Sequence, residues 1–366
     1  MKTIRVGING LGRIGRAFLR RALMHADNHR ISAEKNQRES TFLEVVAVND
    51  LGDINNMAYL LNYDSVYGRS GLKAKGSGDI LEVKGKKIKY LSEKDPAKLP
   101  WKTLDVEVAV ESTGFFASAA LSRAHLEAGA KRVVITAPLR EQSRIDADTD
   151  TQMHADKAET VLMGVNEEKL KTCKISSNAS CTTNAASPII AILDEAIGIE
   201  KAMLNTVHAY TATQSLVDSP AGKKGMREGR AAAVNIVPSS TGAAIAVTKA
   251  YPKLEGKFDG ISLRVPVAIG SIADITFMAK RATSAEEVNE ILRGAAAAPR
   301  WRGIFAATDE GLVSSDIIGS TEGAIAELSM TRVVGGNLVK VLAWYDNEMG
   351  YANTLVKHVL EAGKHV

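Results

Sequence analysis

The residues best suited to chemistry in this chain surround Cys181, in the segment SNASCTTN at positions 177–184. Small hydroxylic and amide neighbours leave a thiol accessible, and their N–H and O–H groups can receive an anion. An isolated cysteine is more often structural than reactive. His208, further along the chain, is however a candidate base for this thiol. A cysteine nucleophile with a distant histidine is a known arrangement, although it specifies no reaction by itself.

A helix is the element that would position Cys181, because the apolar run at 189–193 is typical of a buried helix face. If this helix begins near Cys181, its N-terminal dipole favours the thiolate over the thiol. Pro188 leaves two alternatives. The helix begins at Pro188 with Ser187 as its N-cap, too late to affect the thiol, or it begins at Cys181 and bends where Pro188 cannot donate to the carbonyl of Asn184.

A second candidate site lies near the N-terminus, where a β-branched strand leads into the turn Gly10-x-Gly12-x-x-Gly15. Apolar residues then recur at the spacing of one helix face. Strand, glycine turn and helix together predict a dinucleotide site, in which the glycines let the backbone approach a pyrophosphate at the helix N-terminus.

Asp50, at the end of the second predicted strand, is the acid expected to bind the ribose of such a dinucleotide. It follows Gly10 by 40 positions, against a usual distance of about 20. The excess falls in an almost wholly polar segment at 25–41, which predicts a surface insertion. His25 and His29 in this segment have the i, i+4 spacing of metal ligands but no third ligand, so we expect no metal.

The order of the predicted elements indicates an α/β fold with two domains. Alternating strand and helix patterns predict a doubly wound parallel sheet of the Rossmann type, which we expect at 1–180. Long amphipathic strands in succession then predict an α+β catalytic domain with a mostly antiparallel sheet at 181–347. We expect a last helix at 348–366 to return to the first domain, and a second polar surface insertion at 140–157.

The composition is that of an ordinary globular protein, with 366 residues of which 45% are hydrophobic and 24% charged. A net charge of +4 suits phosphorylated small molecules and is too small to argue for nucleic acid as a main partner. Two cysteines exclude a disulfide framework and predict the reducing cytoplasm, with Cys173 as a buried structural residue. No apolar stretch is long enough to span a membrane, and the N-terminal sequence predicts a strand rather than a signal peptide.

These features together resemble one family, the phosphorylating glyceraldehyde-3-phosphate dehydrogenases, over nearly the whole chain. Nine motifs in family order carry the resemblance: INGLGRIGR at 8–16, VAVNDL at 46–51, YDSVYGR at 63–69, ESTGFF at 111–116, SNASCTTN at 177–184, VHAYTATQ at 207–214, PSSTGAA at 238–244, RVP at 264–266 and WYDNEMGY at 344–351. The chain departs from the family in its two polar insertions, in Ala185, where relatives often have a second cysteine, and in Met349, where many have tryptophan.

The resemblance implies an activity and a mechanism. The activity is the NAD-dependent, phosphorylating oxidation of D-glyceraldehyde 3-phosphate to 1,3-bisphosphoglycerate, a step of glycolysis and gluconeogenesis, through a thiohemiacetal and a thioester on Cys181. His208 would lower the pKa of the thiol, so that a thiolate attacks, and would then take the hydroxyl proton. A homotetramer is also implied, with the loop at 218–230 at its subunit contacts.

The same resemblance assigns the binding residues. The substrate phosphate and the attacking inorganic phosphate require two anion sites, built from hydroxyls, a glycine backbone and guanidinium groups. It assigns Thr211 and Arg264 to the substrate phosphate, Ser180, Thr182, Thr241 and Gly242 to the inorganic phosphate, and Arg230 as a further anion contact. For NAD it assigns Arg13 and Ile14, beside Gly10, Gly12 and Gly15, to the pyrophosphate, Asp50 to the adenosine ribose, Asn347 to the carboxamide, and Lys94 and Thr136 to the cofactor groove.

Two alternative functions are compatible with the same motifs. A sister enzyme would oxidise erythrose 4-phosphate, although the segment AYTAT at 209–213 is more similar to the triose enzyme. A non-catalytic homologue would use the dinucleotide groove to bind a nucleotide or RNA. A pure binding protein has no need for a cysteine, a histidine and two anion sites, so we expect an enzyme.

Overall fold

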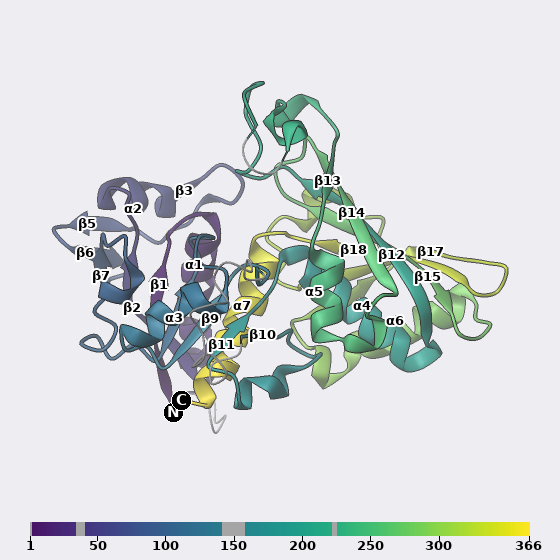
Figure 1. Cartoon of the computed structure of the whole chain (residues 1–366), viewed down its shortest axis with the longest axis horizontal. Coiled ribbons are helices and arrows are strands. Elements are labelled where there is room, and N and C mark those ends of the chain that lie inside the picture. The colour runs from purple at the N-terminus through teal and green to yellow at the C-terminus, as the bar shows by residue number, and fades with distance from the viewer. Residues whose placement is uncertain (1, 34–40, 141–157, 222–224) are drawn as a thin grey trace, which may run out of the picture. The chain divides into compact units, whose positions relative to one another are not determined.

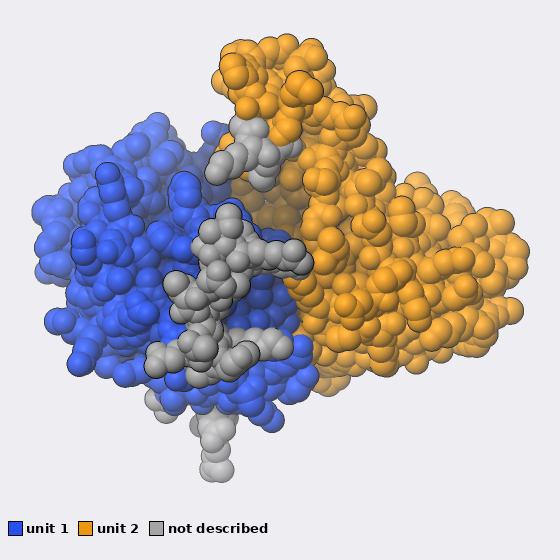
Figure 2. Space-filling model, viewed as in Figure 1, with its two compact units in different colours: residues 1–161, 167–179, 355–366 blue, residues 162–166, 180–354 orange. Residues whose placement is uncertain are grey.

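The structure, a computed structural model, describes residues 2–33, 41–140, 158–221 and 225–366, with the backbone alone for 26–33. These residues form two compact units (Figure 2). Unit 1 comprises residues 1–161, 167–179 and 355–366, and unit 2 comprises residues 162–166 and 180–354. The last helix, α7 (Met349–Lys364), begins in unit 2 and ends in unit 1.

Unit 1 is built on a nine-stranded sheet with the strand order β10-β11-β9-β8-β1-β2-β7-β6-β5 (Figure 1). The seven strands from β10 to β7 are parallel, and β6 and β5 add an antiparallel edge. The strands are β1 (Thr3–Asn9), β2 (Phe42–Asn49), β5 (Lys75–Ser77), β6 (Ile80–Val83), β7 (Lys86–Leu91), β8 (Val108–Glu111), β9 (Arg132–Ile135), β10 (Glu159–Thr160) and β11 (Ile175–Ser177), with a separate hairpin of β3 (Tyr63–Asp64) and β4 (Gly68–Arg69). The parallel sheet confirms the predicted α/β class.

The helices of unit 1 are α1 (Arg13–Ala33), α2 (Ile54–Asn62) and α3 (Ala119–Glu127). In the sheet, β1 has β2 on one side and β8 on the other, so the strand order reverses at β1. In such sheets a ligand binds beside the carboxyl ends of the strands at the point of reversal. Helix α1 extends to Ala33 and so continues into the predicted insertion at 25–41. The side chains of residues 26–40 are not among those that the structure describes, so the exposure of this insertion stays a prediction. Most of the second predicted insertion also lies outside the described residues.

Unit 2 is built on a seven-stranded, mostly antiparallel sheet with the strand order β13-β14-β12-β15-β18-β17-β16. Its strands are β12 (Ile199–Ala209), β13 (Val237–Ser240), β14 (Phe258–Val265), β15 (Ser271–Ala279), β16 (Phe305–Thr308), β17 (Ala324–Val334) and β18 (Leu338–Tyr345). Alternate residues of β15 are fully buried, because one face of the sheet packs against helices. The helices are α4 (Cys181–Ile197), α5 (Ala243–Ala250) and α6 (Ala285–Ala297). Helix α4 lies between α5 and α6, and all three contact the sheet (Figure 1).

Helix α4 settles the alternative that Pro188 left open. The helix begins at Cys181, and Pro188 lies inside it. Ser180 is the N-cap, and its Oγ accepts a hydrogen bond from the backbone N–H of Thr183 at 3.1 Å. Cys181 therefore occupies the first turn, where backbone N–H groups have no partner within the helix.

The C-terminal part of α7 packs in unit 1 against the strand that leads to the cysteine. His358 is fully buried, with Nε2 2.8 Å from Ser176 Oγ and Nδ1 3.2 Å from Asn178 Oδ1. A neutral ring satisfies both contacts, since one nitrogen donates and the other accepts. Burial lowers the pKa of His358 to about 3, so the ring stays neutral in the folded protein at ordinary pH.

Candidate active site

The glycine turn of unit 1 contains Gly10, Gly12 and Gly15, and a side chain would clash with neighbouring backbone at two of these positions but not at the third. Gly10 has φ +94°, and a Cβ there would lie 2.8 Å from the backbone carbon of Ser112. A Cβ on Gly15 would lie 2.1 Å from the carbonyl oxygen of Gly10. A Cβ on Gly12 would meet nothing within 4 Å. The packing of the chain therefore requires Gly10 and Gly15, whereas Gly12 leaves space that a ligand close to the backbone can use.

The turn borders a pocket of about 590 Å³ at the carboxyl ends of the parallel strands. Its lining includes Gly12, Asp50, Lys94 and the exposed ring of Phe115. Asp50 accepts hydrogen bonds from the backbone N–H of Leu11, at 2.6 Å to Oδ2, and of Gly52, at 2.9 Å to Oδ1. Each carboxylate oxygen keeps a further lone pair, so Asp50 can still accept from a hydroxyl in the pocket. Thr136, half-buried, follows β9 and is not part of this pocket lining.

A buried polar network extends from two residues of the pocket lining, Asn9 and Asn49. Asn49 donates to Asn9 at 2.7 Å, and Asn9 donates to the Glu111 carboxylate at 2.6 Å. His125 Nε2 lies 3.0 Å from Glu111, and Trp101 Nε1 donates to the other ring nitrogen at 3.0 Å. Because an indole N–H can only donate, His125 carries its hydrogen on Nε2 and directs it to Glu111. Glu111 is thus compensated by N–H donors even though it is buried.

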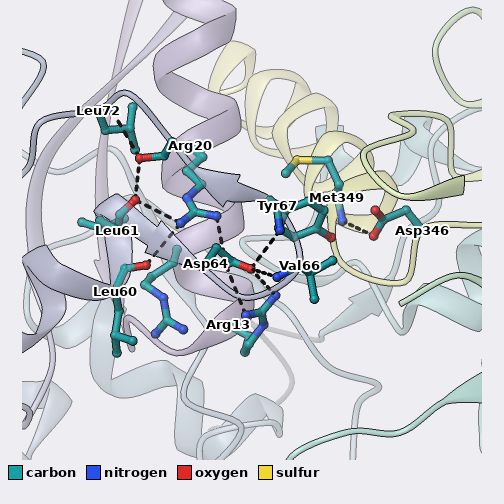
Figure 3. Close-up of polar contacts among 12 residues, drawn as sticks. Arg13, Arg20, Leu60, Leu61, Asp64, Val66, Tyr67, Leu72, Asp346 and Met349 are labelled. Atoms are coloured by element: carbon teal, nitrogen blue, oxygen red, sulfur yellow. Dashed lines mark hydrogen bonds and ion pairs between the residues drawn. The ribbon is translucent and has the colours of Figure 1, made fainter. Parts of the chain in front are cut away.

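Arg13, the first residue of α1, forms an ion pair with Asp64 in this structure (Figure 3). Its Nη1 lies 3.2 Å from Asp64, whose second arginine partner is Arg20 at 3.1 Å. The Asp64 carboxylate also accepts from the backbone N–H groups of Val66 and Tyr67. These four partners hold the pKa of Asp64 below its usual value in spite of burial. The expected contact of Arg13 with a pyrophosphate therefore starts from a guanidinium that Asp64 already orients.

In unit 2, the thiol and the imidazole that the sequence singled out lie together. Cys181 Sγ, in the first turn of α4, is 3.4 Å from Nε2 of His208, near the end of β12. His208 pairs with Arg264 in the neighbouring parallel strand β14, and Arg264 Nη1 lies 2.6 Å from His208 Nδ1. The same Nδ1 is 2.7 Å from the carbonyl oxygen of Ala209. Cys181, His208 and Arg264 thus form one constellation.

The electrostatics of this constellation differ from the thiolate that the sequence predicted. Burial raises the pKa of the Cys181 thiol, although Arg264 and hydrogen bonds from Thr182 act in the opposite direction. Burial and the nearby Arg264 charge lower the pKa of His208 to about 3. The pair is therefore a thiol facing a neutral imidazole, because the loss of solvation outweighs the helix N-terminus.

Tyr345 is a site residue that sequence reasoning missed. Its hydroxyl is fully buried, 2.8 Å from Thr182 Oγ1 and 2.7 Å from Thr206 Oγ1, and its ring meets the His208 ring edge-on. Burial raises its pKa well above the usual range, so it acts only as a neutral hydroxyl. The available signal was its place two residues before Asn347 in the segment WYDNEMGY at 344–351. Asn347 is itself buried, in the turn just before α7, and accepts a hydrogen bond from Ser271. Ser271 is a second site residue that no sequence motif indicated.

The remaining predicted anion contacts are distributed over several elements of unit 2. Ser180 caps α4, and Thr241 Oγ1 accepts from the backbone N–H of Ala243 at the start of α5, where Gly242 is exposed. Thr211 follows the end of β12, its hydroxyl 3.0 Å from that of Thr213. Arg230 is exposed and pairs with Asp218 at 2.9 Å.

Comparison with known proteins decides the family. The model of the glyceraldehyde 3-phosphate dehydrogenase NAD binding domain matches residues 4–119, and that of the C-terminal domain matches residues 180–347. Glyceraldehyde-3-phosphate dehydrogenase 2 of Streptomyces avermitilis is 42% identical to the chain over 100% of both. The glyceraldehyde-3-phosphate dehydrogenase of Mycolicibacterium smegmatis is 43% identical over 99% of each, and glyceraldehyde-3-phosphate dehydrogenase 1 of Bacillus subtilis is 42% identical over 96%. The chain belongs to the glyceraldehyde 3-phosphate dehydrogenase family.

Membership confirms the family that the sequence motifs indicated, and NAD as the cofactor of its N-terminal domain. The pocket of unit 1 fits that cofactor, because Gly12 leaves open space beside the backbone and Asp50 offers a carboxylate to a ribose. Among the described residues, no group of three or more His, Cys, Asp or Glu side chains could hold a metal ion. None of the described helices combines the length and apolar character that a membrane span requires.

Proposed function

We propose that the chain catalyses the NAD-dependent oxidation of glyceraldehyde 3-phosphate with inorganic phosphate, giving 1,3-bisphosphoglycerate. The observation that carries the proposal is the constellation of Cys181, His208 and Arg264, in which a nucleophile, a base and a fixed cation lie within contact of one another. An aldehyde that bears a phosphate needs these three groups: the thiol for its carbon, the imidazole for its proton and the guanidinium for its charge.

The first step is the addition of the thiol to the aldehyde. As the Cys181 sulfur forms its bond to the carbonyl carbon, His208 accepts the thiol proton and returns it to the new alkoxide, which gives a thiohemiacetal with no net change in protons. His208 is suited to this because its lowered pKa keeps the imidazole neutral at ordinary pH. The N–H groups in the first turn of α4 can stabilise the oxygen while it carries charge.

The second step converts the thiohemiacetal to a thioester. His208 takes the hydroxyl proton while the C–H electron pair leaves as hydride. Bound NAD supplies the acceptor for this hydride. Inorganic phosphate then attacks the thioester carbon, and the C–S bond breaks to return Cys181 as a thiolate, which takes its proton back from His208. Ser180, Thr182, Thr241 and Gly242 provide hydroxyl and backbone donors for the attacking phosphate, as their positions in the family motifs indicate.

Arg264 links substrate binding to the state of the base. The contact of His208 Nδ1 with the Ala209 carbonyl requires a hydrogen on Nδ1 and leaves a lone pair on Nε2, facing Cys181. The contact with Arg264 requires the opposite tautomer, because a guanidinium can only donate. A substrate phosphate that engages Arg264 removes this competition and favours the tautomer that can accept the thiol proton.

The protein is further proposed to act as a homotetramer in a reducing compartment such as the cytoplasm. The loop between β12 and β13 exposes large apolar side chains, among them Leu216, Met226 and Val234, which favours association with other subunits. Both cysteines are unpaired, and the mechanism needs Cys181 as a free thiol. Light scattering at micromolar concentration is expected to give four times the 39.1 kDa mass of the chain.

The activity is tested by following NADH at 340 nm with glyceraldehyde 3-phosphate, with and without inorganic phosphate. We expect sustained turnover only with phosphate, because without it the thioester persists and each site reacts about once. Erythrose 4-phosphate serves as the comparison substrate and should give the lower kcat/KM. NADH formation that is independent of phosphate, or a preference for erythrose 4-phosphate, would contradict the proposal.

A further inference from the structure

Asp346 holds the turn that contains Asn347, and within the described ranges the Asn347 side chain has one hydrogen-bond partner, Ser271. Asp346, fully buried, accepts hydrogen bonds from the backbone N–H of Glu348 at 2.9 Å and of Met349 at 2.8 Å, and from that of Gly319 at 2.8 Å. Figure 3 shows the bond between Asp346 and Met349. With the main chain held in this way, the orientation of the Asn347 carboxamide depends on its own side-chain torsions.

Ser271 fixes that carboxamide. It begins β15 between the ends of β12 and β18, and it is fully buried. Its Oγ donates to Asn347 Oδ1 at 3.0 Å and accepts from the backbone N–H of Ala209 at 3.1 Å. Ala209 follows His208 directly, so the Ser271 hydroxyl joins the strand that carries the base to Asn347, in the turn that precedes α7.

The donors and acceptors around Ser271 determine the orientation of the Asn347 carboxamide. The Ala209 N–H is a donor, so Ser271 uses a lone pair there and has a single hydrogen to donate. Within the described part of the chain, Asn347 Oδ1 is the one acceptor within hydrogen-bond distance of that hydroxyl. A buried hydroxyl hydrogen without an acceptor is costly, which excludes the flipped amide with Nδ2 against Ser271. The Nδ2 group of Asn347 therefore faces away from Ser271, with two hydrogens to donate.

We propose that Ser271 is a positioning residue, which orients Asn347 so that its Nδ2 group donates to the carbonyl oxygen of the nicotinamide carboxamide. The inference rests on the proposed function and on the assignment of Asn347 to that carboxamide, which the family resemblance implies. Without the Ser271 hydroxyl the amide can rotate, and it presents oxygen or nitrogen to the ligand with similar ease. Ser271 thus determines recognition of the nicotinamide end of the cofactor and leaves recognition of its adenosine end unchanged.

The test compares equilibrium binding of NAD and of ADP-ribose, which lacks the nicotinamide, to the wild-type protein and to Ser271→Ala. Titration calorimetry should give a dissociation constant for NAD about five- to tenfold weaker in Ser271→Ala, the effect of losing one oriented hydrogen bond. The constant for ADP-ribose should stay at its wild-type value. Equal weakening of both ligands, or no weakening of NAD, would overturn the inference.

Ser262→Ala is the matched control, because Ser262 is also a buried serine in the same sheet but its hydroxyl has no partner among the described residues. It should leave both dissociation constants unchanged.

A further ligand tests the direction of the hydrogen bond between Asn347 and the cofactor. The 3-acetylpyridine analogue of NAD keeps the carbonyl oxygen but has no amide N–H. Wild type should bind it about as tightly as NAD, and a clear loss of affinity would contradict donation by Nδ2. Failure of the proposed reaction shows separately, as wild-type protein that forms no NADH from glyceraldehyde 3-phosphate.

Discussion

The role proposed for Cys181 depends on its neighbour His208. The chain has a second cysteine, Cys173, which is buried and has a pKa raised by burial. Burial acts on Cys181 in the same direction, but Cys181 is partly exposed and has the His208 imidazole 3.4 Å from its sulfur. A base at that distance can remove the thiol proton during attack, which makes a stable thiolate unnecessary.

Alkylation tests this difference. We expect iodoacetamide to label Cys181 before Cys173, as peptide mapping by mass spectrometry would show. In His208→Asn, labelling of Cys181 should slow by at least about tenfold, because no base accepts the proton. Cys181→Ser should abolish turnover and leave NAD binding intact. Preferential labelling of Cys173, or an active serine variant, would show that the nucleophile has been misassigned.

A second prediction for a single residue is that Asp50 sets the preference for NAD over NADP. NADP would place a 2′-phosphate against its carboxylate, and no basic residue follows directly in the segment LGD at 51–53. Asp50→Asn removes the charge and retains an acceptor, so the ratio of kcat/KM for NAD and NADP should fall by roughly tenfold or more. Asp53→Asn is the control, because asparagine also serves as the N-cap of α2. An unchanged ratio in Asp50→Asn would contradict the role of Asp50.

Sequence predicts those parts of the site whose signal is local. The glycine turn and the acid that ends β2 each depend on a few consecutive residues and can be identified from them. The contact between Ser271 and Asn347 joins residues 76 positions apart, and that between Asp64 and Arg13 joins residues 51 apart. Such contacts depend on which strands become neighbours, and no local pattern of residue types specifies that.

At the scale of elements, α4 shows why local signals can also fail to decide. Pro188 satisfies the rules for a helix start and those for a bend equally well. Packing resolves the choice, since 13 of the 17 residues of α4 are buried and the first turn is held by the Ser180 cap. Burial of a whole helix provides more free energy than one missing backbone hydrogen bond removes.

In unit 1, Asp64 connects helix α1 to the β3–β4 hairpin, because its carboxylate forms ion pairs with Arg13 and Arg20 of α1 and accepts hydrogen bonds from the turn between β3 and β4. Asp64→Asn leaves the buried guanidinium of Arg20 without a carboxylate, and we expect the free energy of unfolding to fall by about 2 kcal/mol or more. Urea denaturation followed by circular dichroism measures it. Asp79→Asn is the control, since it removes an exposed ion pair with Lys89 and should change stability little. Equal effects of the two substitutions would contradict the argument.

At the scale of the whole molecule, each unit contains a buried histidine that folding keeps neutral. His208 in unit 2 and His358 in unit 1 both have a folded-state pKa of about 3, against about 6.5 when unfolded. Between these values the unfolded chain binds a proton at each histidine and the folded chain does not. The free energy of unfolding therefore falls as the pH is lowered from about 6.5, by about 1.4 kcal/mol per pH unit for each histidine.

His358→Gln tests this linkage without touching the site, because glutamine can still donate and accept between Ser176 and Asn178. Urea denaturation of wild type and variant should be compared at several pH values from 7 to 4.5. Near pH 7 any difference in stability between them reflects packing alone, since both states of His358 are largely neutral there. Below about pH 6.5 the free energy of unfolding of the variant should fall less steeply with pH than that of wild type. The difference in slope should correspond to about one proton, or about 1.4 kcal/mol per pH unit. Parallel curves throughout would mean that His358 is protonated in the folded protein as readily as in the unfolded chain.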